Sequence, residues 1–267
     1  MSERPIGVID SGLGGLTVLR ALIDLLPDEP VVYFGDTGRF PYGPKPDADV
    51  TKYALEMADL LTEQETKLLV VACNRVSSVA LDELRRQCGI PVIGVIEPGI
   101  RAAIQATESG HVGVIGTVGT IASGAYQRIA EASGADITLT CAACPGFAEF
   151  VEAGDVDSQE VHVLAARLLA PVRAAEVDTL VLGCTHYPLL ARTIADVMGR
   201  DVVLVSSADE TAFEVRGLLD GTGHTRAPGS APPRRMFLTS GDLTTFRTLG
   251  ARFLGPEVET VEAWEWS

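Results

Sequence analysis

The segment KLLVVACN, residues 67–74, has a counterpart of equal length in DTLVLGCT, residues 178–185. Each contains a run of Val and Leu, which is typical of a strand buried on both faces of a parallel sheet. The start of the chain repeats in the same way, because GVIDS at 7–11 matches GVIGT at 113–117. Buried strands can resemble one another by composition alone, but two matches in the same order favour a duplicated α/β unit. Cys73 and Cys184 then end the third strand of each half.

Short apolar runs alternate with longer amphipathic stretches along both halves. The predicted strands are 6–10, 31–36, 68–72, 92–95, 112–116, 137–141, 179–183 and 202–205. The predicted helices are 16–26, 50–63, 77–87, 99–107, 124–132, 160–174 and 189–197. The C-terminal region predicts edge strands at 236–240 and 257–261 around a helix at 243–249, after a surface loop at 221–233 that is rich in Gly, Pro, Ser and Thr. The pattern predicts an α/β fold of two pseudo-symmetric lobes, each a mostly parallel sheet flanked by helices.

Composition limits the partners of the chain. Its 267 residues are 46% hydrophobic, enough for a substantial core, and its formal net charge is −15. Such a charge opposes nucleic acid and anionic membranes, so neither is expected as a partner. The N-terminus leads directly into a predicted strand without the pattern of a signal peptide. Together with an odd number of cysteines, five, this predicts a cytoplasmic protein.

Two cofactor classes find little support in the sequence. Cys141 and Cys144 form a C-x-x-C pair, but no second pair lies near for a zinc site, and the Pro and Gly that follow do not continue as a redox-motif helix. A structural role is therefore expected for this pair. Pyridoxal phosphate needs a lysine, and none of Lys45, Lys52 and Lys67 follows a strand end. The sequence predicts no cofactor and no metal.

Ligands of open α/β sheets bind outside the carboxyl ends of the strands. Small hydroxyl, amide and glycine residues dominate these positions, which are Asp10-Ser11-Gly12, Gly35-Asp36-Thr37, Cys73-Asn74, Gly116-Thr117 and Gly183-Cys184-Thr185-His186-Tyr187-Pro188. The glycines at 12, 14 and 15 lack the lysine of a phosphate-binding loop and do not fit G-x-G-x-x-G. They indicate a tight turn and the close approach of a small ligand rather than nucleotide binding.

Two cysteines in matched positions suggest symmetric chemistry. Racemisation needs a base on one face of a carbon atom and an acid on the other, with the roles exchanged in the reverse direction. An ordinary thiol pKa of about 8.5 allows one thiol and one thiolate near neutral pH. Asp10 is expected to lie near Cys73, and His186 near Cys184. The alternatives are that the cysteines are small core residues and that His186 only fills the start of a helix.

Several segments resemble the glutamate racemase branch of the aspartate/glutamate racemase superfamily, from Ile6 to about Glu214. The strongest are the start Asp10-Ser11-Gly12 and the run Gly183-Cys184-Thr185-His186-Tyr187-Pro188. The others are Gly14-Gly15-Leu16-Thr17-Val18, Gly35-Asp36-Thr37, Pro41-Tyr42-Gly43, Val71-Ala72-Cys73-Asn74, Pro91-Val92-Ile93-Gly94-Val95, Gly116-Thr117, Gly119-Thr120 and Thr211-Ala212.

The resemblance implies an active site in the cleft between the lobes, with residues 1–97 and 207–267 in the first lobe and 98–206 in the second. It implies that Cys73 and Cys184 transfer protons, assisted by Asp10, His186 and Glu152. The predicted substrate-binding residues are Asp10, Ser11, Pro41, Tyr42, Gly43, Cys73, Asn74, Arg75, Thr117, Thr120, Cys184, Thr185 and His186. It further implies a cofactor-independent homodimer that converts L-glutamate to D-glutamate for peptidoglycan.

The sequence departs from the family pattern after the first cysteine. The pattern resembles C-N-T-A-S or C-N-S-A-S, whereas this chain reads Cys73-Asn74-Arg75-Val76-Ser77. Arg75 could pair with a substrate carboxylate, fill the pocket and reduce turnover, or extend into solvent. Two alternative functions therefore stay open: the same mechanism on another amino acid such as aspartate, and a non-catalytic protein that binds an amino acid.

Overall fold

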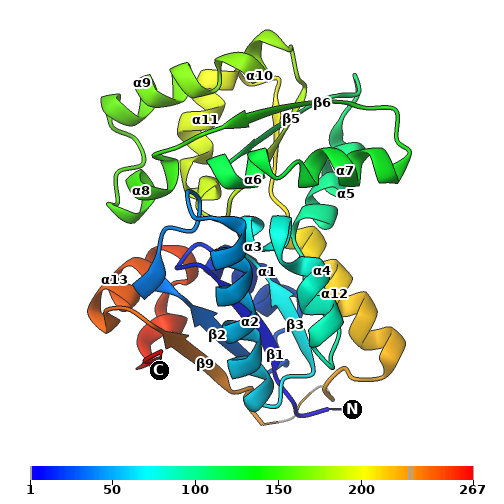
Figure 1. Ribbon diagram of the computed structural model, residues 1–267, viewed down its shortest axis with the longest axis vertical. Helices are drawn as coiled ribbons and strands as arrows, with labels where there is room; N and C mark the ends of the chain where they lie inside the picture. Colours follow the sequence, from blue (N-terminus) through cyan, green and yellow to red (C-terminus); the bar gives the residue numbers. More distant parts are fainter. Residues whose placement is uncertain (1, 228, 230, 267) are drawn as a thin grey trace.

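The computed structural model describes residues 2–227, 229 and 231–266, in which ten strands form two sheets (Figure 1). The first sheet has the order β10-β9-β2-β1-β3-β4, and the second has the order β6-β5-β7-β8. Every pair of neighbouring strands is parallel. The strands are β1 Ile6–Asp10, β2 Val31–Gly35, β3 Leu68–Val71, β4 Val92–Gly94, β5 His111–Gly116, β6 Thr138–Ala143, β7 Thr179–Gly183, β8 Val203–Val205, β9 Arg235–Thr239 and β10 Val261–Ala263.

Helices connect the strands and cover both faces of each sheet (Figure 1). The α-helices are α1 Leu16–Leu25, α2 Asp47–Glu63, α3 Asn74–Val79, α4 Leu81–Gln87, α5 Ile96–Ala106, α6 Val118–Ala122, α7 Ala125–Ser133, α8 Phe147–Glu152, α9 Gln159–Leu168, α10 Ala170–Ala174, α11 Ala191–Met198, α12 Ala208–Thr222 and α13 Leu243–Leu254. Three 3₁₀ turns are η1 Thr37–Arg39, η2 Tyr187–Leu190 and η3 Pro256–Glu259.

The two sheets repeat one arrangement. In each, the first strand of the half lies between the second and the third, giving β2-β1-β3-β4 and β6-β5-β7-β8. Cys73 follows β3 and Cys184 follows β7, and these are equivalent third strands. The prediction of an α/β fold with two lobes built on parallel sheets is confirmed. The lobe boundaries given above remain predictions.

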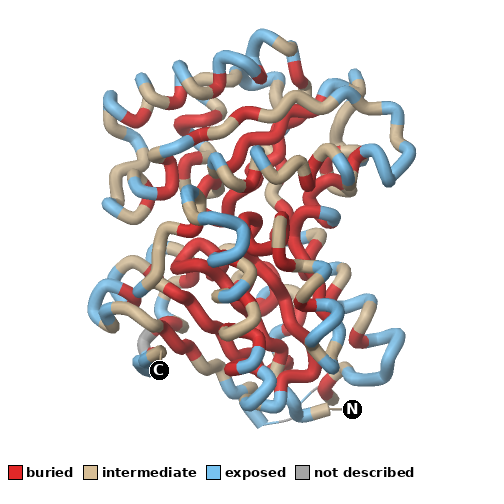
Figure 2. Tube along the Cα trace, viewed as in Figure 1, coloured by how far each residue is buried: buried red, intermediate tan, exposed pale blue. Residues whose placement is uncertain are grey.

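The cores explain why the strands are so uniformly apolar. Side chains of the first sheet alternate between two clusters, as when Val8 packs with α1, α12 and α13 while Ile9 packs with α2, α3 and α4. The second sheet is likewise covered by α8 to α11 on one face and by α5 and α7 on the other. The buried segments of Figure 2 accordingly follow the strands through the centre of each lobe.

Several predicted elements differ from the observed ones. The helix at 77–87 is two helices, α3 and α4, and it begins earlier, at Asn74. The helix at 160–174 is also divided, because Pro171 lies at the start of α10 and cannot donate the hydrogen bond that would continue α9. The strand at 137–141 is displaced and ends at Ala143.

The elements predicted for the C-terminal region also differ from the structure. The predicted strand at 257–261 is wrong over most of its length, since η3 occupies Pro256–Glu259 and the edge strand β10 begins at Val261. α12 was not predicted and extends into the predicted loop at 221–233 as far as Thr222. Residues 228 and 230 of that loop lie outside the described residues. Within the described chain, no helix combines the length and apolar character that crossing a bilayer requires.

A buried ion pair closes the end of the first sheet farthest from the cysteines. Lys67 and Glu29 are each 2% exposed at the side chain and are directly paired. The Lys67 ammonium also donates to the carbonyl oxygen of His224 at 3.0 Å, and Glu29 Oε1 accepts from the Arg226 N–H at 2.7 Å. The pair therefore ties the segment after α12 to the start of β3.

Replacing Lys67 by Met should lower the free energy of unfolding by about 3–5 kcal/mol, because the Glu29 carboxylate would stay buried without its partner. Urea denaturation measures the change. Lys52→Met is the control, since Lys52 is 70% exposed and its pairing with Glu56 is long at 3.9 Å. The control should change stability by less than about 0.5 kcal/mol. Equal effects of the two substitutions would contradict this role of the buried pair.

Candidate active site

A cavity of about 120 Å³ lies between the two sheets, and both Cys73 and Cys184 line it. Its wall consists of segments that follow strands of both lobes: Ser11 after β1, Phe40–Pro44 after β2, Cys73–Arg75 after β3, Thr117, Val118 and Thr120 after β5, Cys144–Gly146, Ala148 and Glu149 after β6, and Gly183–Tyr187 at the end of β7. The carboxyl ends of the two sheets therefore meet at one small enclosed volume, as expected for ligand binding in α/β folds.

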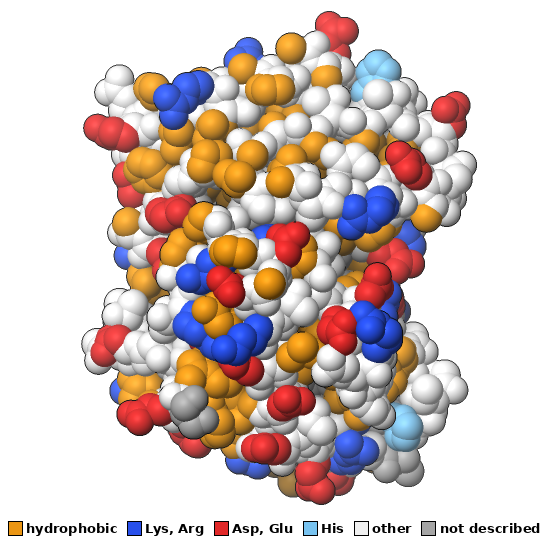
Figure 3. Space-filling model, in the orientation of Figure 1, with side chains coloured by type: hydrophobic (Ala, Val, Ile, Leu, Met, Phe, Trp, Pro, Cys, Tyr) orange, Lys and Arg blue, Asp and Glu red, His pale blue; other side chains and the backbone are white. Residues whose placement is uncertain are grey.

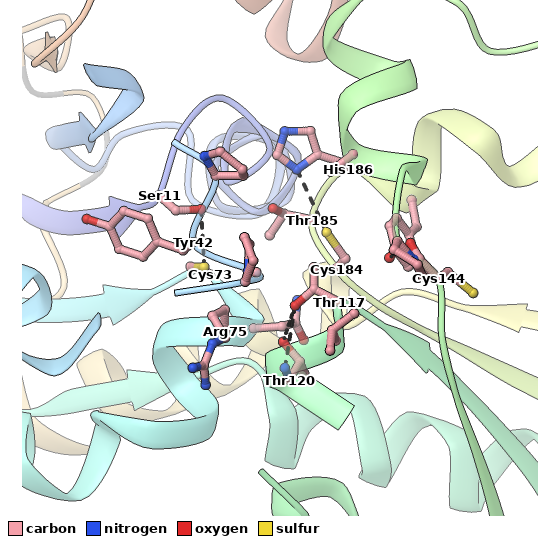
Figure 4. A pocket seen from close by; sticks show the side chains of 18 of the residues that line it. Ser11, Tyr42, Cys73, Arg75, Thr117, Thr120, Cys144, Cys184, Thr185 and His186 are labelled. Atoms are coloured by element: carbon pink, nitrogen blue, oxygen red, sulfur yellow. Dashed lines mark hydrogen bonds between the residues drawn. The ribbon is translucent and has the colours of Figure 1, made fainter. Parts of the chain in front are cut away.

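The two cysteines come from different lobes. In Figure 4, Cys73 and Cys184 lie on different walls of the cavity. Their side chains are buried, with residue exposures of 5% and 8%. Cys73 Sγ lies 3.4 Å from Ser11 Oγ, and Cys184 Sγ lies 3.8 Å from His186 Nδ1. Each sulfur therefore has its own polar partner beside a space for a small molecule.

His186 is held on three sides. Its Nε2 lies 3.0 Å from Glu152 Oε1, and its ring contacts Phe40 and Phe253 of the first lobe at centroid distances of 5.7 and 5.8 Å. Burial alone lowers the pKa of this imidazole, but the hydrogen bonds to Cys184 and Glu152 outweigh it and raise the pKa to about 10. His186 therefore carries a positive charge at neutral pH, directly beside Cys184.

Cys73 lies near a buried carboxylate, whereas Cys184 lies beside a positively charged imidazole. Burial raises the pKa of this thiol, and the nearby Asp10 carboxylate raises it further, to about 12, although the hydrogen bond to Ser11 lowers it. Asp10 is fully buried, accepts from the Gly12 N–H at 3.0 Å, and has a raised pKa because of its burial. Cys73 is therefore a neutral thiol near neutral pH, able to give a proton.

The glycine-rich loop at 12–15 makes room for side chains. A Cβ atom on Gly14 would lie 2.3 Å from Thr185 Oγ1 and 2.6 Å from His186 Nδ1. One on Gly15 would lie 2.6 Å from the Cβ atom of Asp10. The sequence pattern predicts that these glycines allow a tight turn and the close approach of a small ligand. In the structure the bare Cα atom of Gly14 lets Thr185 and His186 of the second lobe lie against the start of α1, and that of Gly15 leaves room for Asp10.

Hydroxyl and amide groups complete the wall. Thr117 Oγ1 lies 2.9 Å from Thr120 Oγ1, and the Asn74 side-chain oxygen accepts from the Tyr126 hydroxyl at 2.7 Å. The Tyr42 hydroxyl donates to the buried carboxylate of Asp36, so its side chain is fixed at the edge of the cavity. Across the described residues, no group of three or more His, Cys, Asp or Glu side chains is arranged to hold a metal ion.

Most predicted site residues line this cavity, namely Ser11, Pro41, Tyr42, Gly43, Cys73, Asn74, Arg75, Thr117, Thr120, Cys184, Thr185 and His186. Asp10 and Glu152 do not line it. Asp10 lies beneath the wall, and Glu152 reaches the site through His186. Arg75 is 3% exposed, so the reading in which it extends into solvent is wrong.

Sequence reasoning missed part of the wall. The additional residues are Phe40, Pro44, Val118, Cys144, Pro145, Gly146, Ala148 and Glu149, whereas Gly183 and Tyr187 belong to a strand-end segment named above. Ligands of open α/β sheets bind just past the carboxyl ends of the strands, which we call the strand-end rule. This rule would have identified Cys144, but the predicted strand ended at residue 141, whereas β6 continues to Ala143. Cys144 thus follows a strand end, as Cys184 does, although Figure 4 shows its sulfur directed away from Cys184. Glu149, on α8, offered no such signal.

Charge on the surface does not mark the site. Acidic and basic side chains are interspersed on the face drawn in Figure 3, despite the net charge of −15. The cavity itself combines a protonated imidazole with neutral hydroxyl groups. Glu149 also lines the cavity, so groups of both signs contribute to its wall.

Comparison with known proteins gives a consistent result. The family model for Asp/Glu/Hydantoin racemase matches residues 6–214. A glutamate racemase of Acidothermus cellulolyticus is 52% identical over 258 residues, or 97% of this chain and 98% of its own. Glutamate racemase isoform RacE1 from Bacillus anthracis has a TM-score of 0.94 at 40% identity, covering 99% of this chain and 98% of that one. Glutamate racemase from Francisella tularensis, solved in complex with D-glutamate, has a TM-score of 0.92 at 33% identity, with the same coverage.

The raised pKa of His186 makes stability depend on pH. Its folded pKa of about 10 exceeds the unfolded value of about 6.5, so its contribution is complete below pH 6.5 and is lost as the pH rises through 10. Urea denaturation at several pH values should show wild type losing its advantage over His186→Asn across this window. The same substitution at exposed His111 should shift stability by less than about 0.5 kcal/mol. A difference from His186→Asn that is constant between pH 6.5 and 10 would contradict the assignment.

Proposed function

The chain belongs to the Asp/Glu/Hydantoin racemase family and is an amino-acid racemase, and from this premise we propose that it interconverts L- and D-glutamate through Cys73 and Cys184 without a cofactor. The observation that carries the proposal is the meeting of these two thiols, one from each lobe, at a single small cavity. Glutamate is chosen because the relatives that match nearly the whole chain are glutamate racemases, and one of them was solved with D-glutamate bound.

The chemistry requires a proton to leave one face of the α-carbon and another to arrive on the opposite face. One cysteine, as thiolate, takes the α-proton, so that the C–H bond breaks and an S–H bond forms. The other cysteine, as thiol, gives its proton to the opposite face, so that the α-carbon is inverted and a thiolate is left behind. In the reverse direction the two sulfurs exchange roles. Atoms and charge balance without any further reagent.

The surroundings of the sulfurs support different resting roles. Cys73 is a neutral thiol near neutral pH, because burial and Asp10 raise its pKa to about 12. Cys184 lies beside His186, which Glu152 holds in place and which is protonated at neutral pH. We assign Asp10 and the His186–Glu152 pair to setting the proton positions on the respective cysteines.

Binding of glutamate must overcome a chain charge of −15. The protonated His186 supplies a positive charge at the cavity wall. Ser11, Asn74, Thr117, Thr120 and Thr185 supply neutral hydrogen-bonding groups there. Such groups can pair with substrate carboxylates without adding negative charge. We assign to them the recognition of the substrate, together with Tyr42 and Gly43 of the neighbouring loop.

The product has a proposed destination and the protein a proposed assembly. D-glutamate would supply peptidoglycan synthesis, which is the role that the resemblance to glutamate racemases implies. The homodimer and the lobe boundaries, residues 1–97 with 207–267 and residues 98–206, belong to the same proposal.

Replacing Cys73 or Cys184 by Ala should lower kcat for glutamate racemisation by about 10²–10⁴-fold, because each variant lacks the acid or base on one face. Circular dichroism of L- and D-glutamate solutions follows the reaction. Cys88→Ala is the matched control, since Cys88 lies at the end of α4 outside the cavity wall and should leave kcat within twofold.

Exchange of the α-proton in heavy water is the decisive test of the proposed function. Wild type should introduce deuterium at the α-carbon of the inverted product, as nuclear magnetic resonance can detect. If neither glutamate enantiomer exchanges its α-proton, glutamate is not the substrate. If aspartate alone exchanges, the mechanism survives with a different substrate. Tight glutamate binding without exchange would indicate a non-catalytic protein.

A further inference from the structure

Arg75 occupies an unusual place in the site. It is the second residue of α3, directly after the Cys73-Asn74 pair, and only 3% of it is exposed. Part of it lines the cavity, yet its guanidinium is directed away from both sulfurs in Figure 4. The function of this guanidinium must therefore be found among the groups that surround it.

The first partners lie on the loop that forms one wall of the cavity. Arg75 Nη2 donates to the Lys45 carbonyl oxygen at 2.9 Å and to Asp47 Oδ1 at 2.5 Å. Lys45 and Asp47 directly continue the wall segment Phe40–Pro44. Because charge-assisted hydrogen bonds are the stronger kind, these contacts hold the wall segment against α3.

The second partner lies in the other lobe. Arg75 Nη1 donates to the Gly119 carbonyl oxygen at 3.4 Å, and the Gly119 N–H donates to the Gly43 carbonyl oxygen at 3.1 Å. Gly119 makes this approach feasible, because a Cβ atom there would lie 2.4 Å from Arg75 Nε and 2.6 Å from the Gly43 oxygen. Arg75, Gly43 and Gly119 thus form one contact between the lobes beside the cavity.

We propose that Arg75 is a positioning residue, an interlobe brace that fastens the wall segment Phe40–Pro44 to α6 and keeps the two lobes closed over the substrate. It acts through Asp47, Lys45, Gly43 and Gly119, and not by pairing with a substrate carboxylate. Its two terminal nitrogens already donate to protein oxygens, and Nε, which is buried and makes no hydrogen bond, lies against Gly119. The kinetic tests of the brace rest on the proposed racemase function.

Removing the brace should weaken substrate binding more than turnover. Arg75→Met keeps the aliphatic stem but loses the donors, so the closed arrangement of the lobes becomes less populated. We expect KM for glutamate to rise about five- to tenfold and kcat to fall by no more than about twofold. A substitution that only impaired folding would instead lower kcat with KM unchanged.

Substitution of Asp47 is a second test of the brace, at a position where folding should not be impaired. Its side chain is 70% exposed, so Asp47→Asn should fold normally while weakening the ion pair with Arg75. KM should rise about two- to threefold, and the effect should be much smaller when Arg75→Met is already present, since both changes act on one contact. Asp49→Asn is the matched control, with the same charge change at an exposed position in the same helical turn and no expected change in KM.

Hydrogen exchange tests the brace without substrate. The Gly119 N–H lies in the first turn of α6, where no intrahelical partner exists, so its protection depends on Gly43. In Arg75→Met this amide should exchange at least about tenfold faster than in wild type. This measurement stays informative even if wild type proves not to racemise glutamate.

Three results would contradict the proposal that Arg75 is an interlobe brace. A raised KM in Arg75→Met with unchanged Gly119 exchange and no effect of Asp47→Asn would mean that Arg75 contacts the substrate directly. A lowered kcat at constant KM would mean support of folding only. Unchanged kinetics and unchanged exchange would mean that the lobes are held closed by other contacts.

Discussion

The close approach of Gly14 to Thr185 and His186 is the contact on which the site depends. A side chain at position 14 would occupy the space of the Thr185 hydroxyl and the His186 ring. With the bare Cα, the end of β7 fits against the start of α1, and the Thr17 hydroxyl reaches the Thr185 carbonyl oxygen at 3.3 Å. This contact is one of those that bring the two sheets together so that Cys184 and Cys73 face one cavity. The aromatic rings of Phe40 and Phe253 then fix the orientation of His186.

The two cysteines occupy equivalent positions in the two lobes, but the charged groups near them differ. The duplicated strands place equivalent cysteines, but one lies near a buried carboxylate and the other beside a buried imidazole. Burial amplifies both effects, because a low dielectric strengthens the interaction between neighbouring charges. The two equivalent thiols thereby lie in chemically different surroundings.

The strand pattern and the strand-end rule carried most of what the sequence could reveal. The repeated Val and Leu runs located the third strand of each half and hence both cysteines, because such runs are distinctive of parallel sheets. The rule failed at Cys144, where the end of β6 was placed two residues early by half-buried residues that lack a clear pattern. It also could not reveal the side chains that reach the site from helices. Glu149 and Phe253 lie on α8 and α13, and only the packing of the lobes brings them near His186 and the cavity. The path of the Arg75 guanidinium was equally hidden, since it depends on the absence of a side chain at Gly119.

The strand order has a consequence for how the chain reaches its native state during synthesis. The four strands of the second sheet are contiguous in sequence, whereas the first sheet receives β9 and β10 only after the whole second sheet has been made. One core cluster of the first sheet also includes Val215 of α12 and Phe246 of α13. Until those helices leave the ribosome, α1 alone of the three covering helices can pack on this face of β1 and β2, and the half made first is the last to be completed. A nascent chain of this kind keeps part of an apolar sheet face exposed to solvent for most of its translation.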